Sequence, residues 1–301
     1  MFTLAQISDV HLSPLPRPAF YHLLSKRALG YVNWHRRRGH HRRDVLDRLM
    51  DDLLGHKPDH IAMTGDLVNI ALPEEFRAVR VWLESIGGPD DITVIPGNHD
   101  AYVPFLRGPG YSQWQPYMSG NAAGLEMMEG YGRSFPFVRI LGQIALVCLS
   151  TARATMPAMA SGRVGRRQMR SAADLLERLG REGYCRVVLI HHPPLPGMTP
   201  WQRALHDARR FQKVLIENGA ELVLHGHNHR VMLLRLHGRT GPIPIVGAPS
   251  ASLASADPIR SAAYNFFSIA KGGNGAWRID MRSRSLGLDG KFTERHEELL
   301  P

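Results

Sequence analysis

The sequence predicts an α/β fold, and the order of its apolar segments is the main reason. Up to about residue 225, short apolar runs typical of buried strands alternate with stretches of helical periodicity. Beyond that point the apolar runs follow one another across turns that contain Gly and Pro, without helices between them. The chain has 301 residues, 44% of them hydrophobic and 21% charged, which is enough for one large domain or two small ones.

The first half of the chain is expected to begin with a strand at Phe2–Ile7, followed by an irregular basic stretch. A helix near Arg43–His56 has an apolar face, and a helix over Pro73–Ile86 starts with a proline, which suits a first helical turn. Strands are predicted at Ile61–Met63 and Ile92–Ile95. Residues 101–135 are rich in Gly, Tyr and Met without a clear period, so we expect them to form a cap or lid over a site.

The second half continues the alternation and then becomes strand-rich. The alternating elements are expected at Ile144–Leu149, 166–182, Val187–Ile190, 204–218 and Leu222–Leu224. The later strands are expected at Val231–His237, Ile243–Val246, Tyr264–Ala270 and Ala276–Arg282, where they would form a second sheet. Residues 284–301 are charged and poorly patterned, and we expect them to be a surface tail behind a single domain over 1–283.

Five polar clusters stand directly after five of the predicted strands. They are Asp9-Val10-His11, Gly65-Asp66, Gly97-Asn98-His99-Asp100, His191-His192 and Gly226-His227-Asn228-His229. In open α/β sheets, ligands bind at the carboxyl ends of the strands. The clusters must therefore converge in space, and no Pro/Gly/Ser-rich linker separates them, which favours one domain over two.

The residue types in these clusters indicate metal binding. Asp, Asn and His supply the oxygen and nitrogen donors that suit first-row divalent or trivalent metals. No cluster contains cysteine, so a structural zinc site is not expected. Cys148 and Cys185 lie in or beside apolar runs and are predicted to be buried thiols, and two cysteines are too few for a disulfide scaffold.

The five clusters, in this order, resemble the pattern D-x-H, G-D, G-N-H-D/E, H and G-H-x-H of the calcineurin-like metallophosphoesterase superfamily. The sequence His-His-Pro-Pro at 191–194 and Gly-Ala-Pro-Ser at 247–250 is most similar to the branch that hydrolyses cyclic nucleotides and glycerophosphodiesters. The resemblance implies a four-layer α-β-β-α sandwich of two mixed β-sheets flanked by helices.

The resemblance also implies a role for each cluster residue. Asp9, His11 and His229 would hold a first metal, and Asn98, His191 and His227 a second. Asp66 would bridge both, because a carboxylate can offer two anionic oxygens to two cations. His99 would be the catalytic residue that assists the leaving group as a general acid or charge stabiliser. Asp100 would orient a histidine.

Two further assignments stay open at this stage. His192 would either contact substrate or pack against the Pro pair that follows it. The two metal ions would be manganese, iron or both by family habit, with zinc or cobalt also compatible with a mixed nitrogen and oxygen site. The other histidines, including His40 and His41, have no partner that the sequence places, and we expect them to be solvated or packed.

The function implied is metal-dependent hydrolysis of a phosphodiester, a cyclic nucleotide or glycerophosphodiester, by a hydroxide shared between two metal ions. One alternative is a membrane-associated hydrolase of a lipid-linked pyrophosphate or phospholipid. Hydrolases of the UDP-diacylglucosamine type tend to carry Arg where this chain has His99, which argues against that subtype. A second alternative is a scaffold of the same fold that only binds a partner, although such proteins usually lack metal ligands and none is missing here. The oligomeric state stays open.

The net charge of +10 is concentrated in a basic insert at about residues 17–43. Eight Lys or Arg and no Asp or Glu lie between Val10 and Arg43, interleaved with aromatic and leucine side chains. This composition suits a solvated loop packed on the domain, a segment that contacts an anionic membrane, or a segment that binds an anionic substrate. Nucleic-acid binding is less favoured, because the basic residues are confined to one segment.

The predicted location is the cytoplasm, with peripheral contact at the inner face of the membrane as the alternative. The first predicted strand starts within a few residues of Met1, and no apolar run reaches the ~18 residues of a membrane span.

Overall fold

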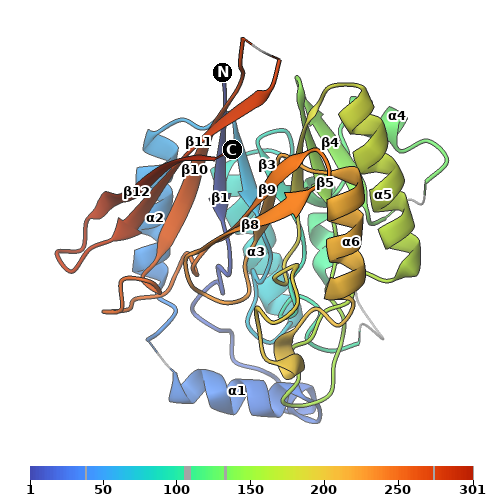
Figure 1. Ribbon diagram of the computed structural model, residues 1–301. Helices are drawn as coiled ribbons and strands as arrows, with labels where there is room; N and C mark the ends of the chain where they lie inside the picture. The colour runs from blue at the N-terminus through green and yellow to red at the C-terminus, as the bar shows by residue number, and fades with distance from the viewer. Residues whose placement is uncertain (38, 105–109, 132–133, 274, 301) are drawn as a thin grey trace.

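The computed structural model describes residues 1–37, 39–104, 110–131, 134–273 and 275–300, and contains two six-stranded sheets packed face to face (Figure 1). The first sheet has the order β12-β11-β10-β1-β2-β3 and the second β4-β5-β6-β7-β9-β8. The strands of the first are β1 (Phe2–Ile7), β2 (His60–Met63), β3 (Ile92–Val94), β10 (Ala263–Lys271), β11 (Trp277–Leu286) and β12 (Phe292–Leu300). Those of the second are β4 (Phe137–Leu141), β5 (Ile144–Cys148), β6 (Cys185–Leu189), β7 (Leu222–His225), β8 (Met232–Gly238) and β9 (Gly241–Gly247).

Both sheets are mixed. In the first, β1, β2 and β3 are parallel and β10 to β12 continue the sheet antiparallel. In the second, β5, β6, β7 and β9 are parallel, with β4 and β8 antiparallel at the two edges. The α2 (Arg43–Gly55) and α3 (Pro73–Ile86) helices cover the first sheet, and α5 (Arg166–Arg181) and α6 (Ala208–Asn218) cover the second (Figure 1). The predicted four-layer α-β-β-α sandwich is confirmed.

Alternation along the strands explains the layers. In β6, Val187 and Leu189 pack in the cluster that lies between the sheets, whereas Val188 packs with Leu175 of α5 and Phe211 of α6. A strand buried on both faces reads as a continuous apolar run, which is why the sequence marks the parallel strands clearly.

Two features of the C-terminal part differ from the prediction. The later strands do not form a sheet of their own: β8 and β9 complete one sheet, and β10 and β11 the other. The predicted charged tail is also wrong, because residues 284–286 end β11 and Phe292–Leu300 is an edge strand paired with it. Edge strands are held by backbone hydrogen bonds and tolerate charged side chains, so a charged sequence does not exclude one.

The described part of residues 101–135 does not form the predicted cap over the site. Trp114 is fully buried and donates a hydrogen bond from Nε1 to the Phe76 carbonyl of α3 (3.0 Å), and Tyr117 bonds the Gly87 carbonyl (3.0 Å) at the far end of that helix. The short helical segments Gly110–Met118 and α4 (Ala122–Met127) therefore pack beside α3 and β4. Only Tyr102 of these residues lines the cavity described below, and 105–109 and 132–133 lie outside the described residues.

The basic insert is not an irregular loop. It contains a short 3-10 turn at Phe20–Leu23 and the α1 helix (Arg27–Arg36), which lies across the carboxyl ends of the parallel strands (Figure 1). Arg38 lies outside the described residues. Among the helices that the structure describes, none is long and apolar enough to cross a membrane.

Candidate metal centre

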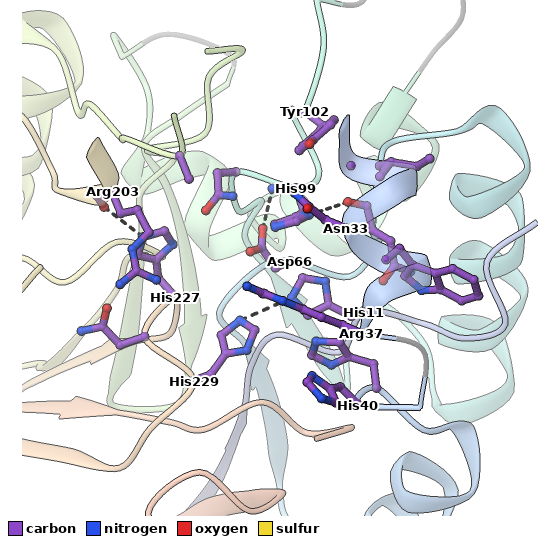
Figure 2. A pocket seen from close by; sticks show the side chains of 18 of the residues that line it. His11, Asn33, Arg37, His40, Asp66, His99, Tyr102, Arg203, His227 and His229 are labelled. Atoms are coloured by element: carbon purple, nitrogen blue, oxygen red, sulfur yellow. Dashed lines mark hydrogen bonds between the residues drawn. The ribbon is translucent and has the colours of Figure 1, made fainter. Parts of the chain in front are cut away.

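Four of the five polar clusters line one cavity of about 920 Å³, at the carboxyl ends of the parallel strands (Figure 2). His11, Asp66, Asn98, His227 and His229 line it, as does the predicted catalytic His99. The remaining predicted ligands, Asp9 and His191, are completely buried behind this lining. The structure therefore brings the whole predicted set together.

The backbone turns sharply where each strand delivers its ligand. Asp9, His11, Asp66, His227 and His229 have φ values of 52°, 42°, 57°, 70° and 48°, the left-handed region that residues other than glycine rarely adopt. Such a conformation costs on the order of 1 kcal/mol per residue and persists only where surrounding contacts enforce it. These contacts include hydrogen bonds from Asp9 N to the Gly65 carbonyl (2.9 Å) and from His11 N to the Asp66 carbonyl (3.0 Å).

The first predicted metal position lies among Asp9, His11 and His229. The Nε2 atoms of the two histidines are 3.4 Å apart, and His229 Nε2 is 3.1 Å from Asp9 Oδ1. Asp9 Oδ1 is buried and has no hydrogen bond of acceptable geometry within the described residues. A buried carboxylate oxygen facing two imidazole nitrogens fits a cation, which would satisfy all three atoms.

The second predicted position lies among Asn98, His191, His227 and Asp66. His191 Nε2 is 3.2 Å from Asn98 Oδ1 and 3.3 Å from Asp66 Oδ2, while its Nδ1 lies 2.7 Å from the Thr64 carbonyl. A carbonyl partner on Nδ1 leaves Nε2 for a metal, the usual arrangement for a ligating histidine. The ligand atoms of Asp66, His191 and His227 all lie within 4.8 Å of one another. His227 Nε2 lies 2.9 Å from the Arg203 carbonyl.

Electrostatics favour an ionised Asp66 at the centre. Burial alone would raise the pKa of Asp66, but the neighbouring His191, His99 and His11 hold it well below its usual value. Burial opposes protonation of His191 as well, yet the Asp66 carboxylate raises the pKa of that histidine to about 9. The pKa of His11 is lowered, first by burial and then by His41 and His99. The site thus contains the carboxylates of Asp9 and Asp66 surrounded by imidazole rings. This donor set fits two cations that share Asp66.

His99 is placed for a role beside the metals. Its Nδ1 contacts the Asn69 carbonyl, its backbone N–H donates to Asp66 Oδ1 (2.7 Å), and its ring stacks on Tyr102 at 5.5 Å between centroids. With Nδ1 engaged, Nε2 is the nitrogen available to a molecule in the cavity. His99 also forms a possible ligand group with His11 and Asp66, so the geometry alone allows a metal contact too.

The predicted role of Asp100 is wrong. Its carboxylate accepts backbone N–H bonds from Asp66 (2.9 Å), Leu67 (2.9 Å), Val68 (3.1 Å) and Gly97 (2.8 Å). Within the described residues, none of the hydrogen-bond partners of this carboxylate is a histidine. Asp100 instead holds the loops that carry Asp66 and Asn98 in shape. Burial and the Asp66 charge raise the pKa of Asp100 to about 7, and the N–H donors oppose that rise.

His192 is a packing residue rather than a substrate contact. It is fully buried, with Nδ1 2.7 Å from Thr151 Oγ1 and Nε2 3.0 Å from the Ala160 carbonyl. Both ring nitrogens are therefore occupied, and the ring lies 4.3 Å from that of His227. Burial, followed by the charge of His191, lowers the pKa of His192 to about 3, so the ring stays neutral and supports His227.

The basic insert forms one wall of the cavity, which is the position that its substrate-binding alternative requires. Arg27 donates to the carbonyls of Ile70 and Ala71, and Lys26 donates to Thr155 Oγ1 and the Met159 carbonyl, both at 2.8 Å. Arg37, His40 and His41 line the cavity, and Figure 2 shows Arg37 and His40 on the side of His11. His41 was expected to be solvated or merely packed, yet its ring lies 4.4 Å from that of His11.

A two-sheet sandwich with Asp, Asn and His side chains gathered at the strand ends is the arrangement expected of a metal-dependent hydrolase. The model of the calcineurin-like phosphoesterase family matches residues 2–231. The chain belongs to this family and is a metal-dependent phosphoesterase.

Two curated relatives are similar in sequence. A probable cyclic nucleotide phosphodiesterase of Synechococcus is 26% identical over 92% of this chain and 90% of its own length. The glycerophosphodiester phosphodiesterase of Enterobacter lignolyticus is 38% identical over 21% of this chain and 22% of its own length.

Solved structures share the fold. A dimetal phosphatase from Danio rerio has a TM-score of 0.63 at 12% identity, covering 99% of this chain and 98% of its own. The purple acid phosphatase PPD1 from yellow lupin has a TM-score of 0.55 at 12% identity, covering 99% of this chain and 53% of its own.

Proposed function

We propose that the protein hydrolyses a small organic phosphodiester, with cyclic nucleotides and glycerophosphodiesters as the nearest substrate classes. The observation that carries this proposal is the presence of all predicted ligands around one cavity, with His99 beside them. The names of the two curated relatives favour a diester over a monoester. Two bound ions, manganese, iron or both, would supply an acidified hydroxide and charge stabilisation at phosphorus.

The residues of this chain divide the remaining work. Asp66 would be a ligand of both ions, and the backbone bonds to Asp100 keep its loop in place. His99 gives a proton to the leaving oxygen or stabilises its charge. A cavity of about 920 Å³ has room for both substituents of a diester.

The direct test is a substrate comparison with the manganese-loaded protein. Bis(p-nitrophenyl) phosphate, p-nitrophenyl phosphate, cyclic nucleotides, glycerophosphodiesters and a lipid pyrophosphate would each be assayed beside the Asp66→Ala variant. We expect diesters to be turned over with the highest kcat/KM, and the variant to be inactive on all of them. A higher kcat/KM for the monoester would overturn the phosphodiesterase assignment.

A second candidate function, at a membrane surface, rests on a different observation. Phe20, Tyr21 and Leu24 are 79%, 59% and 81% exposed in the segment that leads into α1. Apolar side chains of this kind beside basic residues suit peripheral contact with an anionic bilayer, from the cytoplasmic side, and a lipid-linked substrate. Against it, Arg42 and Arg43 pair with Asp44 and Asp47 and are not available as a uniform basic face.

Vesicle sedimentation distinguishes the two candidates. Binding to vesicles with anionic lipid but not to neutral vesicles, weakened by salt and by Phe20→Ser with Leu24→Ser, would support the membrane function. Failure to sediment with anionic vesicles even at low salt would remove it and leave the soluble diester.

A further inference from the structure

His41 is held in place from both its backbone and its ring. Its carbonyl accepts a bond from Ser13 Oγ (3.0 Å), and a β-bridge joins it to Leu253. The next residue continues the attachment, since Arg42 N donates to the Ser252 carbonyl (2.8 Å). The basic insert is thus fastened to the loop after β9 at the point where His41 enters the cavity.

The ring of His41 joins the first predicted metal position. It lies 4.4 Å from the ring of His11 and 5.6 Å from that of His229. One ligand nitrogen from each of these three histidines lies within 4.8 Å of the others. Three imidazoles at this separation, next to the unsatisfied Oδ1 of Asp9, can surround one cation.

Two serines determine which nitrogen of His41 is available. Ser250 donates its single hydroxyl proton to the Asp9 carbonyl (2.6 Å), so it can only accept from its other neighbours. His41 Nδ1 lies 3.3 Å from Ser250 Oγ and 2.9 Å from Ser252 Oγ, and Ser252 Oγ is 3.4 Å from Ser250 Oγ. All of these hydrogen bonds can form together if Ser252 Oγ donates to Ser250 Oγ and the Nδ1–H of His41 donates to the serine oxygens. Nε2 then carries a lone pair for a metal.

We propose that His41 is an additional ligand of the first metal ion, supplied by the basic insert, and that Ser250 and Ser252 fix its ring orientation. The insert would then be tied to the metal as well as to the protein. This inference depends on a metal at the first position and not on the diester assignment, so a failed substrate screen would leave it standing.

The test measures metal binding by the full-length protein without substrate. The metal-free protein is titrated with Co²⁺, and affinity is followed by equilibrium dialysis with elemental analysis and by the visible absorption of the bound ion. We expect His41→Asn to weaken one of two sites by roughly 10–100-fold and to change the Co²⁺ spectrum. His35→Asn, a change at an exposed histidine of the same insert that does not line the cavity, is the matched control and should leave both unchanged.

Two results would overturn the proposal. One is that His41→Asn binds Co²⁺ with unchanged affinity and an unchanged spectrum. If KM for substrate alone rises in that variant, His41 is a substrate contact and not a metal ligand. If circular dichroism shows that His41→Asn is not folded, the Ser252→Ala variant is used to test the proposal. This variant retains His41 but removes a hydrogen-bond partner of its ring. For Ser252→Ala we expect a smaller loss of Co²⁺ affinity and an altered Co²⁺ spectrum. An unaltered spectrum in this variant would be the second result that overturns the proposal.

Discussion

The two walls of the cavity are built in different ways. On one wall, Asp9, Asp66 and His191 sit at the ends of strands and are at most 1% exposed, with their loops fixed by backbone bonds. On the other wall, α1 has no buried residue. It is held by hydrogen bonds from Lys26 and Arg27 and by Tyr31 and Trp34 packed on a small cluster.

This difference separates chemistry from recognition. Regions with few buried apolar contacts open at lower free energy than the core. The strand-end wall can therefore keep the metal positions at a fixed geometry, while the α1 wall can adapt to different substrates. Changes on the first wall should reduce turnover and metal binding. Changes on the second, with the exception of His41, should alter substrate binding.

The largest effect is expected from Asp66→Ala on the strand-end wall. If Asp66 bridges two ions as proposed, its loss leaves the cations without the charge that offsets their repulsion, so both sites should weaken. We expect kcat/KM to fall by more than about 10³-fold, the scale seen when transition-state charge stabilisation is lost. His11→Ala, which affects one position, should cost less. Kinetics with metal analysis test this, and two tightly bound ions with substantial activity in Asp66→Ala would contradict it.

His99→Ala should separate proton transfer from metal binding on the same wall. If His99 assists the leaving group, both metals stay bound and turnover falls by roughly 10²–10⁴-fold. The loss should be smaller for p-nitrophenolate, which leaves without a proton, than for an alkoxide. An equal loss for both leaving groups, or a missing metal ion, would make His99 a ligand or positioning residue instead.

The free energy of unfolding should depend on pH through His60, a buried residue of β2, the strand that leads to Asp66. His60 is 1% exposed and bonds Thr93 Oγ1 (2.7 Å) and the Asp90 carbonyl (3.0 Å). Burial, followed by the charge of Arg139, lowers its pKa to about 4. The unfolded chain binds a proton near pH 6.5 and the folded chain does not, so stability falls as the pH drops from about 6.5 to 4.

The size of this effect is about 3 kcal/mol over the whole interval. Urea unfolding of the metal-free protein at several pH values measures it. The control is His60→Gln, which can keep hydrogen bonds but does not titrate, so its unfolding free energy should fall less over the same interval. Parallel curves for the two proteins would contradict the prediction.

The smallest effect is expected from Arg37→Ser on the α1 wall. Arg37 lines the cavity and is exposed, so its attraction for a phosphate is screened and amounts to about 1 kcal/mol. KM for an anionic diester should rise by roughly 3–10-fold with kcat unchanged, and the difference should shrink in high salt. Arg36→Ser, a change at a neighbouring exposed arginine outside the cavity lining, is the control. A fall in kcat would place Arg37 with the chemical machinery.

The sequence was sufficient for the strand-end wall because its signals are local. Each ligand cluster follows a buried strand, and the apolar runs before Asp9, Asp66 and His191 mark those strands clearly. The four-layer sandwich was implied by the family resemblance that these motifs carry, and it was confirmed.

The composition of the basic insert left substrate contact open, but the α1 helix itself could not be predicted because it lacks such a signal. This helix has no apolar face, and it is stabilised by side chains that reach carbonyl groups far away in sequence, as Arg27 does at Ile70 and Ala71. His41 likewise meets its serines more than 200 residues along the chain. Contacts of this kind depend on tertiary structure, and no periodicity in the sequence records them.

The left-handed backbone at the ligand positions has a consequence for laboratory evolution. Glycine would adopt the conformations of Asp9, His11, Asp66, His227 and His229 without steric cost, and without metal the buried carboxylates and crowded imidazoles gain little in return. A library selected for heat resistance in a chelating buffer would therefore enrich glycine at these positions and lose catalysis. Only a medium that supplies metal during selection would let stability and activity improve together.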